Sequence, residues 1–520
     1  MGLRTGEQYR EALRDGREIW LEGERIADVT RDPRLRNTVD MVAEMYDLQH
    51  RPELAETLTY VPDDSDDGEP CGLSFLEPRS EADLVRRREM VKVWMDWTGG
   101  MMGRSMDFMN IHMTGFGSAS EYFSQAGEQF GENARNYYKF ARKNDLALTH
   151  VLINPQNDRS KQVHEQTHDT AARIVEENDA GIVIRGARMV STFAPFADEI
   201  ATFPSTYLQA SEESRPYAFA FCLPVATPGL RFICRPTVGP SGGRVLDYPF
   251  SSRLDEMDAV VVFDDVLVPW DRVFINGDPY LCNTLFPGTG TMNQIMHQFG
   301  VKNLAKAEFV LGVALNLTES VGTNGFQQVQ NQLAEIINAV EFVRSALRAS
   351  EADCLPGPNG TVLPNPQPLW TVRTMFPDMY QRLVQILQTL GASGLVATPS
   401  IAEVEGPRGQ DIMQYYQAAA LPGDKRIELF RLAWDLACSS FAGRQALYER
   451  YFSGDPWRLM MTRYQTYPAK DELKERVWQF IDRAREWDKR VLDGGSAPSA
   501  DQSSTNQSST TPPDSPPRAS

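Results

Sequence analysis

Histidines are the side chains best suited to moving a proton near neutral pH, and this sequence of 520 residues contains only six of them. One of them, His150, lies inside an apolar run, with Leu148 before it and Val151-Leu152-Ile153 after it. A histidine in such a run is either a core residue whose ring is hydrogen bonded or a functional residue held away from water. His150 is therefore a candidate for general acid–base chemistry.

Two further histidines match a metal-binding motif, because residues 164–168 read HEQTH, an HExxH pattern. On a helix both histidines would face the same side and could bind zinc, with the glutamate as general base. The flanking residues are polar, however, and the motif has no downstream histidine as third ligand, so that Glu176, Glu177 or Glu199 would have to be guessed. We interpret the segment as a solvated helix with two surface histidines and predict no metal site.

The composition argues against several classes of function. The chain has 52 Lys and Arg against 70 Asp and Glu, and its net charge of −18 argues against a general binder of nucleic acid or anionic membranes, which needs a basic surface. No window of about 18 apolar residues predicts a membrane span, and the N-terminus lacks the apolar core of a signal peptide. The six cysteines are scattered without a CxxC pair, so we expect a reducing, cytoplasmic location.

The elements that must position these residues follow the order α, then β, then α. Proline-free helical patterns cover residues 82–95 and 120–140. Short β-rich runs bounded by Pro, Gly and Ser follow at 181–189, 217–225, 230–234 and 259–268. Apolar residues then recur at helical spacing over 329–347 and 430–441, the second after a start signal at 422–424.

These patterns divide the chain into domains. We predict an N-terminal helical domain at 1–147, a central β-rich domain at 148–285 and a C-terminal helical bundle at 286–490. The remainder, 491–520, is rich in Ser, Thr, Pro and Gln and has almost no apolar residues. Such a segment cannot offset its ordering entropy by burial, so we predict a disordered tail.

Four segments in this order carry a resemblance to a known family. They are GRSMDFMN (Gly103–Asn110), LTHVLINPQNDR (Leu148–Arg159), DEMDAVVVFDDVLVPWDRVFI (Asp255–Ile275) and YERYFSGDPWR (Tyr448–Arg458). Together they resemble the oxygenase component of two-component flavin monooxygenases, the 4-hydroxyphenylacetate 3-hydroxylase family, which includes the chlorophenol monooxygenases. The resemblance implies an α+β, acyl-CoA-dehydrogenase-like fold with an N-terminal helical domain, a central β domain and a C-terminal helical bundle.

The resemblance also implies a chemistry. A separate flavin reductase would supply reduced FAD by diffusion, and O2 would add at flavin C4a to give a hydroperoxide. One oxygen atom would then be transferred to a phenol, ortho to its hydroxyl or at a halogenated carbon. The flavin carries the difficult step, while the protein supplies position, electrostatics and the exclusion of water. The family is generally homotetrameric, and we carry that over as an expectation.

Individual residues acquire roles through the same resemblance. Arg104 matches an arginine beside the substrate phenol, and His150 matches a histidine that contacts the phenol hydroxyl and the flavin. His297 falls where the chlorophenol branch has a base, although it could equally make a structural hydrogen bond at a helix terminus. The implied catalytic residues are Arg104, His150 and His297, and the implied substrate contacts are Arg104, Phe108, His150, Ser205 and Thr206.

Flavin contacts are implied for three further segments besides His150. From the residues alone, Thr192 and Ser453 would be ordinary strand or turn residues, and residues 454–456 would form a turn that ends a helix. Matched to the family's motifs, the cofactor-binding residues are His150, Gln156, Asn157, Asp158, Arg159, Thr192, Ser453, Gly454, Asp455 and Pro456. The side chains of Gln156 and Arg159 offer donors to flavin carbonyl or phosphate oxygens.

One position departs from the family pattern. The phenylacetate hydroxylases have tyrosine four residues after the motif arginine, and this chain has Phe108. The loss of that hydroxyl favours a phenol other than simple 4-hydroxyphenylacetate. The likeness points to enediyne-pathway hydroxylases of antibiotic biosynthesis, which act on a chlorinated β-tyrosine held on a peptidyl carrier protein.

Other functions remain open from the sequence. A free chlorophenol or 4-hydroxyphenylacetate would make the chain an enzyme of aromatic catabolism. An acyl-CoA-dehydrogenase-type flavoenzyme shares the fold but would leave the phenol-contact motifs unexplained. A non-catalytic protein that kept the fold would be expected to lose Arg104 and His150, and both are present.

Overall fold

The computed structural model describes residues 2–65, 68–155, 157–204, 207–240 and 242–494. The chain forms two compact units, the first ending at Pro456 and the second beginning at Trp457. This division falls inside the predicted C-terminal bundle and coincides with none of the predicted domain boundaries, which stay predictions. The predicted tail lies outside the described residues from position 495 onward.

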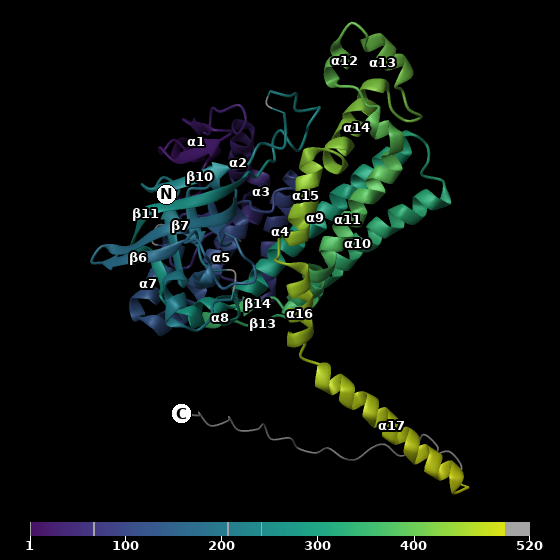
Figure 1. Ribbon diagram of the computed structural model, residues 1–520. Coiled ribbons are helices and arrows are strands. Elements are labelled where there is room, and N and C mark those ends of the chain that lie inside the picture. The colour runs from purple at the N-terminus through teal and green to yellow at the C-terminus, as the bar shows by residue number, and fades with distance from the viewer. Residues whose placement is uncertain (1, 66–67, 156, 205–206, 241, 495–520) are drawn as a thin grey trace. The chain divides into compact units, whose positions relative to one another are not determined.

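Strands of the first unit form two main sheets (Figure 1). The six-stranded sheet has the order β2 (Glu24–Ile26), β1 (Glu18–Leu21), β10 (Leu230–Cys234), β11 (Asp258–Pro269), β7 (Gly181–Thr192) and β6 (Arg173–Asn178). The four-stranded sheet has the order β12 (Val273–Asn276), β9 (Phe219–Pro224), β8 (Glu199–Thr202) and β5 (Leu148–Val151). Two short pairs are β3 (Thr59–Tyr60) with β4 (Cys71–Gly72), and β13 (Leu355–Pro356) with β14 (Val362–Leu363).

The predicted β-rich runs are confirmed as β7, β9, β10 and β11. Strands β1 and β2 were not predicted; they are short and lie within the region predicted as helical. They join the main sheet because β1 pairs in parallel with β10, with Ile19 opposite Phe232. The chain's N-terminal segment is therefore built into the central sheet.

Helices precede and follow the strands. The N-terminal ones are α1 (Gly6–Ala12), α2 (Arg36–Leu48), α3 (Pro52–Leu58), α4 (Glu81–Trp97), α5 (Met106–Ser118), α6 (Ser120–Phe123) and α7 (Glu128–Asn144). The helix predicted over 82–95 is confirmed as α4. The helical pattern over 120–140 is confirmed as α6 and α7, which are separated at Gly127, whose φ of +152° is not helical.

The C-terminal helices of the first unit are α8 (Pro279–Thr289), α9 (Thr291–Ser320), α10 (Gln327–Ala352), α11 (Pro366–Val396), α12 (Ile401–Glu405), α13 (Gly409–Tyr415), α14 (Gly423–Ala437) and α15 (Ser440–Tyr451). The helical spacing over 329–347 is confirmed as α10. The spacing over 430–441 crosses two helices, because the side chain of Ser439 accepts a hydrogen bond from Ala442 N and starts α15.

The second unit holds most of α16 (Pro456–Thr466) and all of α17 (Lys470–Leu492). None of the residues of α17 is buried. Within the described residues, no helix is long and apolar enough to cross a membrane.

Helix α5 packs against α7, α9 and β5 within the first unit (Figure 1). Every residue from Met106 to Ser118 is buried, as expected of a helix that is covered on all sides. The segment that leads into α5 requires glycines. Gly100 has a φ of +70°, and a Cβ there would lie 2.7 Å from the backbone N of Lys306. A Cβ on Gly103 would lie 2.5 Å from the Tyr448 hydroxyl, so Gly103 lets the chain pass close to α15.

Candidate active site

Arg104 carries a buried positive charge that aromatic ring faces stabilise. It lies just before α5, and its guanidinium carbon is 4.1 Å from the ring centre of Phe108 and 4.0 Å from that of Phe452. Desolvated cation–π contacts are worth about 2 kcal/mol or more. Its Nε and Nη1 are buried and have no acceptor among the described residues. The N–H groups on these atoms are therefore left to donate to a ligand.

The carboxylates near the Arg104 side chain, Glu256 and Asp258, form ion pairs with the guanidinium of Arg444 instead. Glu256 Oε1 accepts a hydrogen bond from the backbone N of Arg104 at 2.6 Å, while Glu256 Oε2 accepts one from Arg444 Nη1 at 2.9 Å. Arg444 Nη2 also donates to Asp258 Oδ1 at 2.9 Å. Burial lowers the pKa of Arg104, which nevertheless stays charged because a guanidinium is not deprotonated in proteins.

Strand β5 brings His150 to the same place. It pairs in parallel with β8, with His150 opposite Ala201. The side chain is 8% exposed, and its Nδ1 is buried without a partner among the described residues. Burial, and then the charge of Arg104, lowers the pKa of His150 well below 6.5. The imidazole is therefore neutral at physiological pH, and one of its ring nitrogens is an acceptor.

Aromatic rings surround His150. Its ring centre lies 5.6 Å from that of Phe108 and 6.4 Å from that of Phe203. The His112 ring, one helical turn after Phe108, has its centre 4.7 Å from that of Phe108 and 6.2 Å from that of His150. The Phe286 ring centre lies 5.8 Å from that of Phe203 and 6.3 Å from that of His112. We call these five residues the aromatic box.

The structure places His297 outside this group. Its Nε2 lies 2.9 Å from Glu351 Oε1, which also accepts a hydrogen bond from Arg88 Nε at 2.8 Å. These residues come from α9, α10 and α4, and the ring of His297 is fully buried among them. Of the three predicted catalytic residues, the structure therefore brings Arg104 and His150 together and leaves His297 in a polar cluster between helices.

The predicted flavin loop after β5 is held by its own side chains. Asn157 Nδ2 donates to Thr170 Oγ1 at 2.7 Å, and Asp158 Oδ1 accepts from Ser160 N at 3.0 Å. Arg159 is exposed, and no ion pair involving it is found within the described part of the chain. Gln156 lies outside the described residues, as do the predicted substrate contacts Ser205 and Thr206.

The remaining predicted flavin contacts lie at two other places. Thr192 ends β7 and is buried, with its Oγ1 donating to Asp258 Oδ1 at 2.6 Å. Ser453 follows Phe452 directly, and its carbonyl oxygen accepts from Arg373 Nη2 at 2.7 Å. Gly454 has a φ of +119° in the turn that precedes Asp455, and α16 begins at Pro456. This turn is thus tied to α5 through Phe452 and Arg104.

The HExxH segment is not a helix, so the predicted solvated helix is wrong. Residues Val163–Glu165 form a single turn, because Gln166 folds the segment back by accepting from Asp158 N at 3.0 Å and donating to Asp158 O at 2.8 Å. His164 Nδ1 lies 3.2 Å from Ser214 Oγ. Among the residues that the structure describes, no group of three or more His, Cys, Asp or Glu side chains could hold a metal ion.

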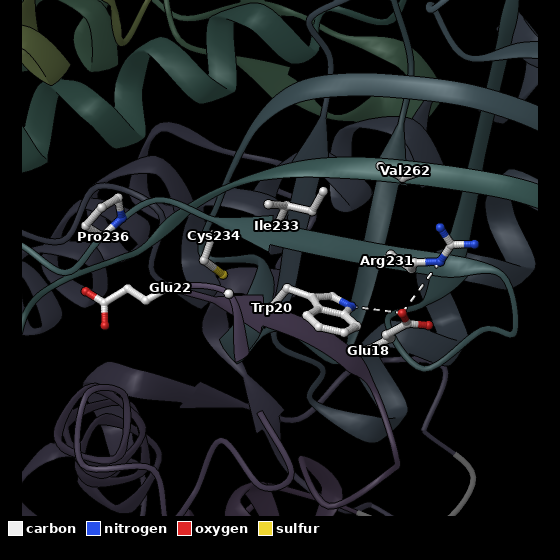
Figure 2. A pocket seen from close by; sticks show the side chains of 9 residues that line it. Glu18, Trp20, Glu22, Arg231, Ile233, Cys234, Pro236 and Val262 are labelled. Carbon is white, nitrogen blue, oxygen red and sulfur yellow. Dashed lines mark hydrogen bonds and ion pairs between the residues drawn. The ribbon is translucent and has the colours of Figure 1, made fainter. Parts of the chain in front are cut away.

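A surface hollow of about 680 Å³ lies on the six-stranded sheet (Figure 2). Trp20 Nε1 donates to Glu18 Oε1 at 2.9 Å, and Arg231 pairs with Glu18 and Asp264. None of the predicted site residues lines it, and its cation is already paired with carboxylates. This hollow does not fit a flavin phosphate, and we assign the site to the aromatic box.

Sequence reasoning missed four members of the site's walls: His112, Phe203, Phe286 and Phe452. A signal existed for His112, because it lies four residues after Phe108 in a proline-free segment, so both share a helix face. Phe452 lay inside a recognised motif, although nothing in the sequence indicated that it covers Arg104. Phe203 and Phe286 carried no signal beyond ordinary core composition.

Comparison with known proteins shows which proteins this chain is similar to. Family models described as the N-terminal and C-terminal parts of 4-hydroxyphenylacetate 3-hydroxylase match residues 5–275 and 282–482. The 4-hydroxyphenylacetate 3-monooxygenase oxygenase component of Thermus thermophilus is 43% identical and covers 92% of this chain and 97% of its own. A Streptomyces globisporus (3S)-3-amino-3-(3-chloro-4-hydroxyphenyl)propanoyl-[peptidyl-carrier protein SgcC2] monooxygenase is 32% identical, covering 95% of this chain and 92% of its own.

A solved structure extends the likeness to three dimensions. The oxygenase component of 4-hydroxyphenylacetate 3-monooxygenase complexed with FAD and 4-hydroxyphenylacetate matches this chain with a TM-score of 0.88 and 42% identity. The match covers 93% of this chain and 99% of that one. It confirms the predicted α+β, acyl-CoA-dehydrogenase-like fold.

Proposed function

The chain belongs to the 4-hydroxyphenylacetate 3-hydroxylase family, and we propose that it hydroxylates a phenol ortho to its hydroxyl with reduced FAD and O2. One atom of O2 enters the aromatic C–H bond and the other leaves as water, with two electrons from reduced FAD. A separate flavin reductase supplies the reduced FAD, which fits the relatives' description as oxygenase components.

One observation carries this proposal. The buried Arg104 side chain has N–H groups without acceptors and lies against Phe108, whose ring also contacts His150. A phenolate oxygen is an acceptor that these donors could bind, and the guanidinium charge would stabilise it. The neutral imidazole of His150 can accept the hydrogen bond, or the proton, of the phenol.

The residues around the box fit the proposed cofactor. Asn157 and Arg159 are exposed donors on the loop that follows His150, and the Ser453–Pro456 turn follows the ring that covers Arg104. When bound, reduced FAD would supply the activation of O2. The chain's own part is to hold the phenol by Arg104, to keep its ring between aromatic side chains and to exclude water.

Two substrate classes have separate support. The Streptomyces relative is named for a chlorinated tyrosine-derived phenol on a carrier protein, and Phe108 removes a hydroxyl that simple phenylacetate hydroxylases have. We propose that class, in natural-product biosynthesis, as the substrate. Free 4-hydroxyphenylacetate is the second candidate, supported by the higher identity to the Thermus enzyme.

A substrate panel tests the proposal. The purified chain is supplied with FAD, NADH and a flavin reductase in air, and given free and carrier-bound phenols. We expect catechol products one oxygen atom heavier than their substrates, and the class with the highest kcat/KM identifies the substrate. Oxygen consumption that yields only hydrogen peroxide with every phenol would contradict the proposal. The variant His168→Gln, which changes an exposed histidine outside the box, is run through the same panel as a control.

A further inference from the structure

His112 lies in the aromatic box without a role assigned to it. It is 2% exposed, and its ring contacts Phe108, His150, Phe203 and Phe286 at centre distances of 4.7, 6.2, 6.3 and 6.3 Å. A buried imidazole among aromatic rings loses hydration, so a polar atom on it needs a partner. The question is which of its two nitrogens is engaged.

The protonation of His112 follows from one hydrogen bond. Its Nδ1 lies 2.9 Å from the carbonyl oxygen of Phe108, and a carbonyl oxygen only accepts, so Nδ1 carries the hydrogen. Burial lowers the pKa of His112 to about 3, so the ring is neutral. Nε2 is therefore a bare acceptor, and no hydrogen bond to it is found within the described ranges.

The position of His112 decides what that acceptor meets. Arg104, Phe108 and His112 follow one another at intervals of four residues, and Phe108 contacts both of the others. If Arg104 binds the oxygen of a phenol, the aromatic ring of the phenol points away from Arg104. A substituent para to the hydroxyl then points toward His112. The Phe108 ring contacts the guanidinium of Arg104 and the ring of His112, so we place the ring of the phenol between Arg104 and His112.

We propose that His112 is a specificity-determining residue whose Nε2 accepts a hydrogen bond from a donor group on the substrate's side chain. Such a lone pair favours an amide, hydroxyl or ammonium group at that point and repels a carboxylate. This inference rests on the proposed phenol hydroxylation, and it names the substrate class as phenols with a hydrogen-bond donor in their side chain. A buried acceptor left unpaired by the wrong substrate costs about 1–3 kcal/mol, which is enough to discriminate.

An isosteric pair of phenols tests it. 4-Hydroxyphenylacetamide and 4-hydroxyphenylacetate have the same shape, but only the amide has N–H donors and only the acid has a negative charge. We expect the native chain to prefer the amide in kcat/KM by about tenfold or more. We expect His112→Phe to abolish that preference, with the ratio of the two kcat/KM values as the measured quantity.

A second variant covers the outcome in which His112→Phe fails to fold. His112→Gln keeps a polar side chain and adds an N–H donor, so we expect it to raise the relative kcat/KM for the acid. A preference that is unchanged in both variants, or an equal loss with unsubstituted phenol, would overturn the inference. Equilibrium dialysis of the two phenols against the native chain separates the hypotheses: stronger binding of the amide without any hydroxylation would contradict the proposed function but not the role of His112.

Discussion

Phe452 covers Arg104 from a distance of 4.0 Å between ring centre and guanidinium carbon, although 348 residues separate them in the chain. Phe452 follows α15, and Arg104 precedes α5, so two distant motifs meet at one charge. Because Phe108 lies against the guanidinium at 4.1 Å, a buried cation is held without a carboxylate partner. The buried Nε and Nη1 donors stay available for an anionic oxygen.

Replacing Arg104 should remove most of the activity. Arg104→Met keeps the apolar stem but deletes the charge and its N–H donors, and we expect kcat/KM to fall about 100-fold or more. Arg104→Lys should recover only part of it, because an ammonium lacks the planar donor pair. Arg185→Met, at an exposed ion pair with Asp265, is the control and should leave the rate unchanged. Equal rates for Arg104→Met and the native chain would refute the assignment.

His150 should act as a neutral group over the working pH range. Because its pKa lies well below 6.5, lowering the pH from 8 to 6 does not protonate it, and we expect no inflection near pH 6.5 from this residue. His150→Phe should lower kcat about 100-fold through the lost acceptor. A pH–rate profile of the native chain with an inflection near 6.5 that disappears in His150→Phe would show instead that the imidazole titrates normally.

Phe108→Tyr restores a hydroxyl beside Arg104 and His150. The Phe108 ring centre is 5.6 Å from that of His150, so a para hydroxyl would introduce a donor into the box. We expect the variant to shift the ranking of phenols toward 4-hydroxyphenylacetate by a factor of about ten in relative kcat/KM. If the substrate ranking and rates do not change, position 108 does not contribute to specificity.

Glu449 should be a stability determinant behind the site. Its Oε1 is 2.5 Å from both Lys302 Nζ and Lys306 Nζ, and all three side chains are at most 2% exposed. Burial lowers the pKa of Lys302 to about 7, and Glu449 is the carboxylate that opposes this effect. Glu449→Gln leaves two buried lysines unpaired, and we expect it to lower the free energy of unfolding by about 3–5 kcal/mol. Glu428→Gln, at an exposed pair with Lys425, should change it by less than about 1 kcal/mol in the same urea titration.

His112 should make the fold sensitive to acid. Its pKa is lowered to about 3 by burial, so the unfolded chain binds a proton below about pH 6.5 that the folded chain does not. Stability from this group is therefore present above pH 6.5 and is lost as the pH falls toward 3. Between pH 8 and pH 5, His112→Gln should lose about 2 kcal/mol less unfolding free energy than the native chain. Identical losses in urea titrations at the two pH values would indicate that His112 is solvated.

The sequence predicted the fold better than it predicted the site. The β-rich runs bounded by Pro, Gly and Ser located β7, β9, β10 and β11, and the helical patterns located α4 and α10. Two breaks were missed, at Gly127 and before Ser439, because apolar spacing continues across a short turn between helices. Strands as short as β1 and β2 have too few residues for a periodic signal.

The site was predictable where its residues lie in the motifs that carry the family resemblance. Arg104 and His150 lie in recognised motifs, and the structure brings them to one box. His297 shared the residue type, yet a neighbouring glutamate from another helix, Glu351, engages its ring, and no local pattern predicts such a partner. The aromatic walls at Phe203 and Phe286 arise from tertiary packing alone, which leaves no local sequence pattern.

The most direct test of this account is to follow 18O2 into the product. The chain is incubated with a flavin reductase, NADH, FAD and its best phenol under 18O2, and the product is analysed by mass spectrometry. We predict a catechol that carries one 18O atom ortho to the original hydroxyl. Arg104→Met should lose formation of this labelled catechol, and Arg185→Met should retain it. A catechol without 18O, or one formed equally by Arg104→Met, would contradict the central claim that Arg104, beside the aromatic box, holds the phenol for monooxygenation.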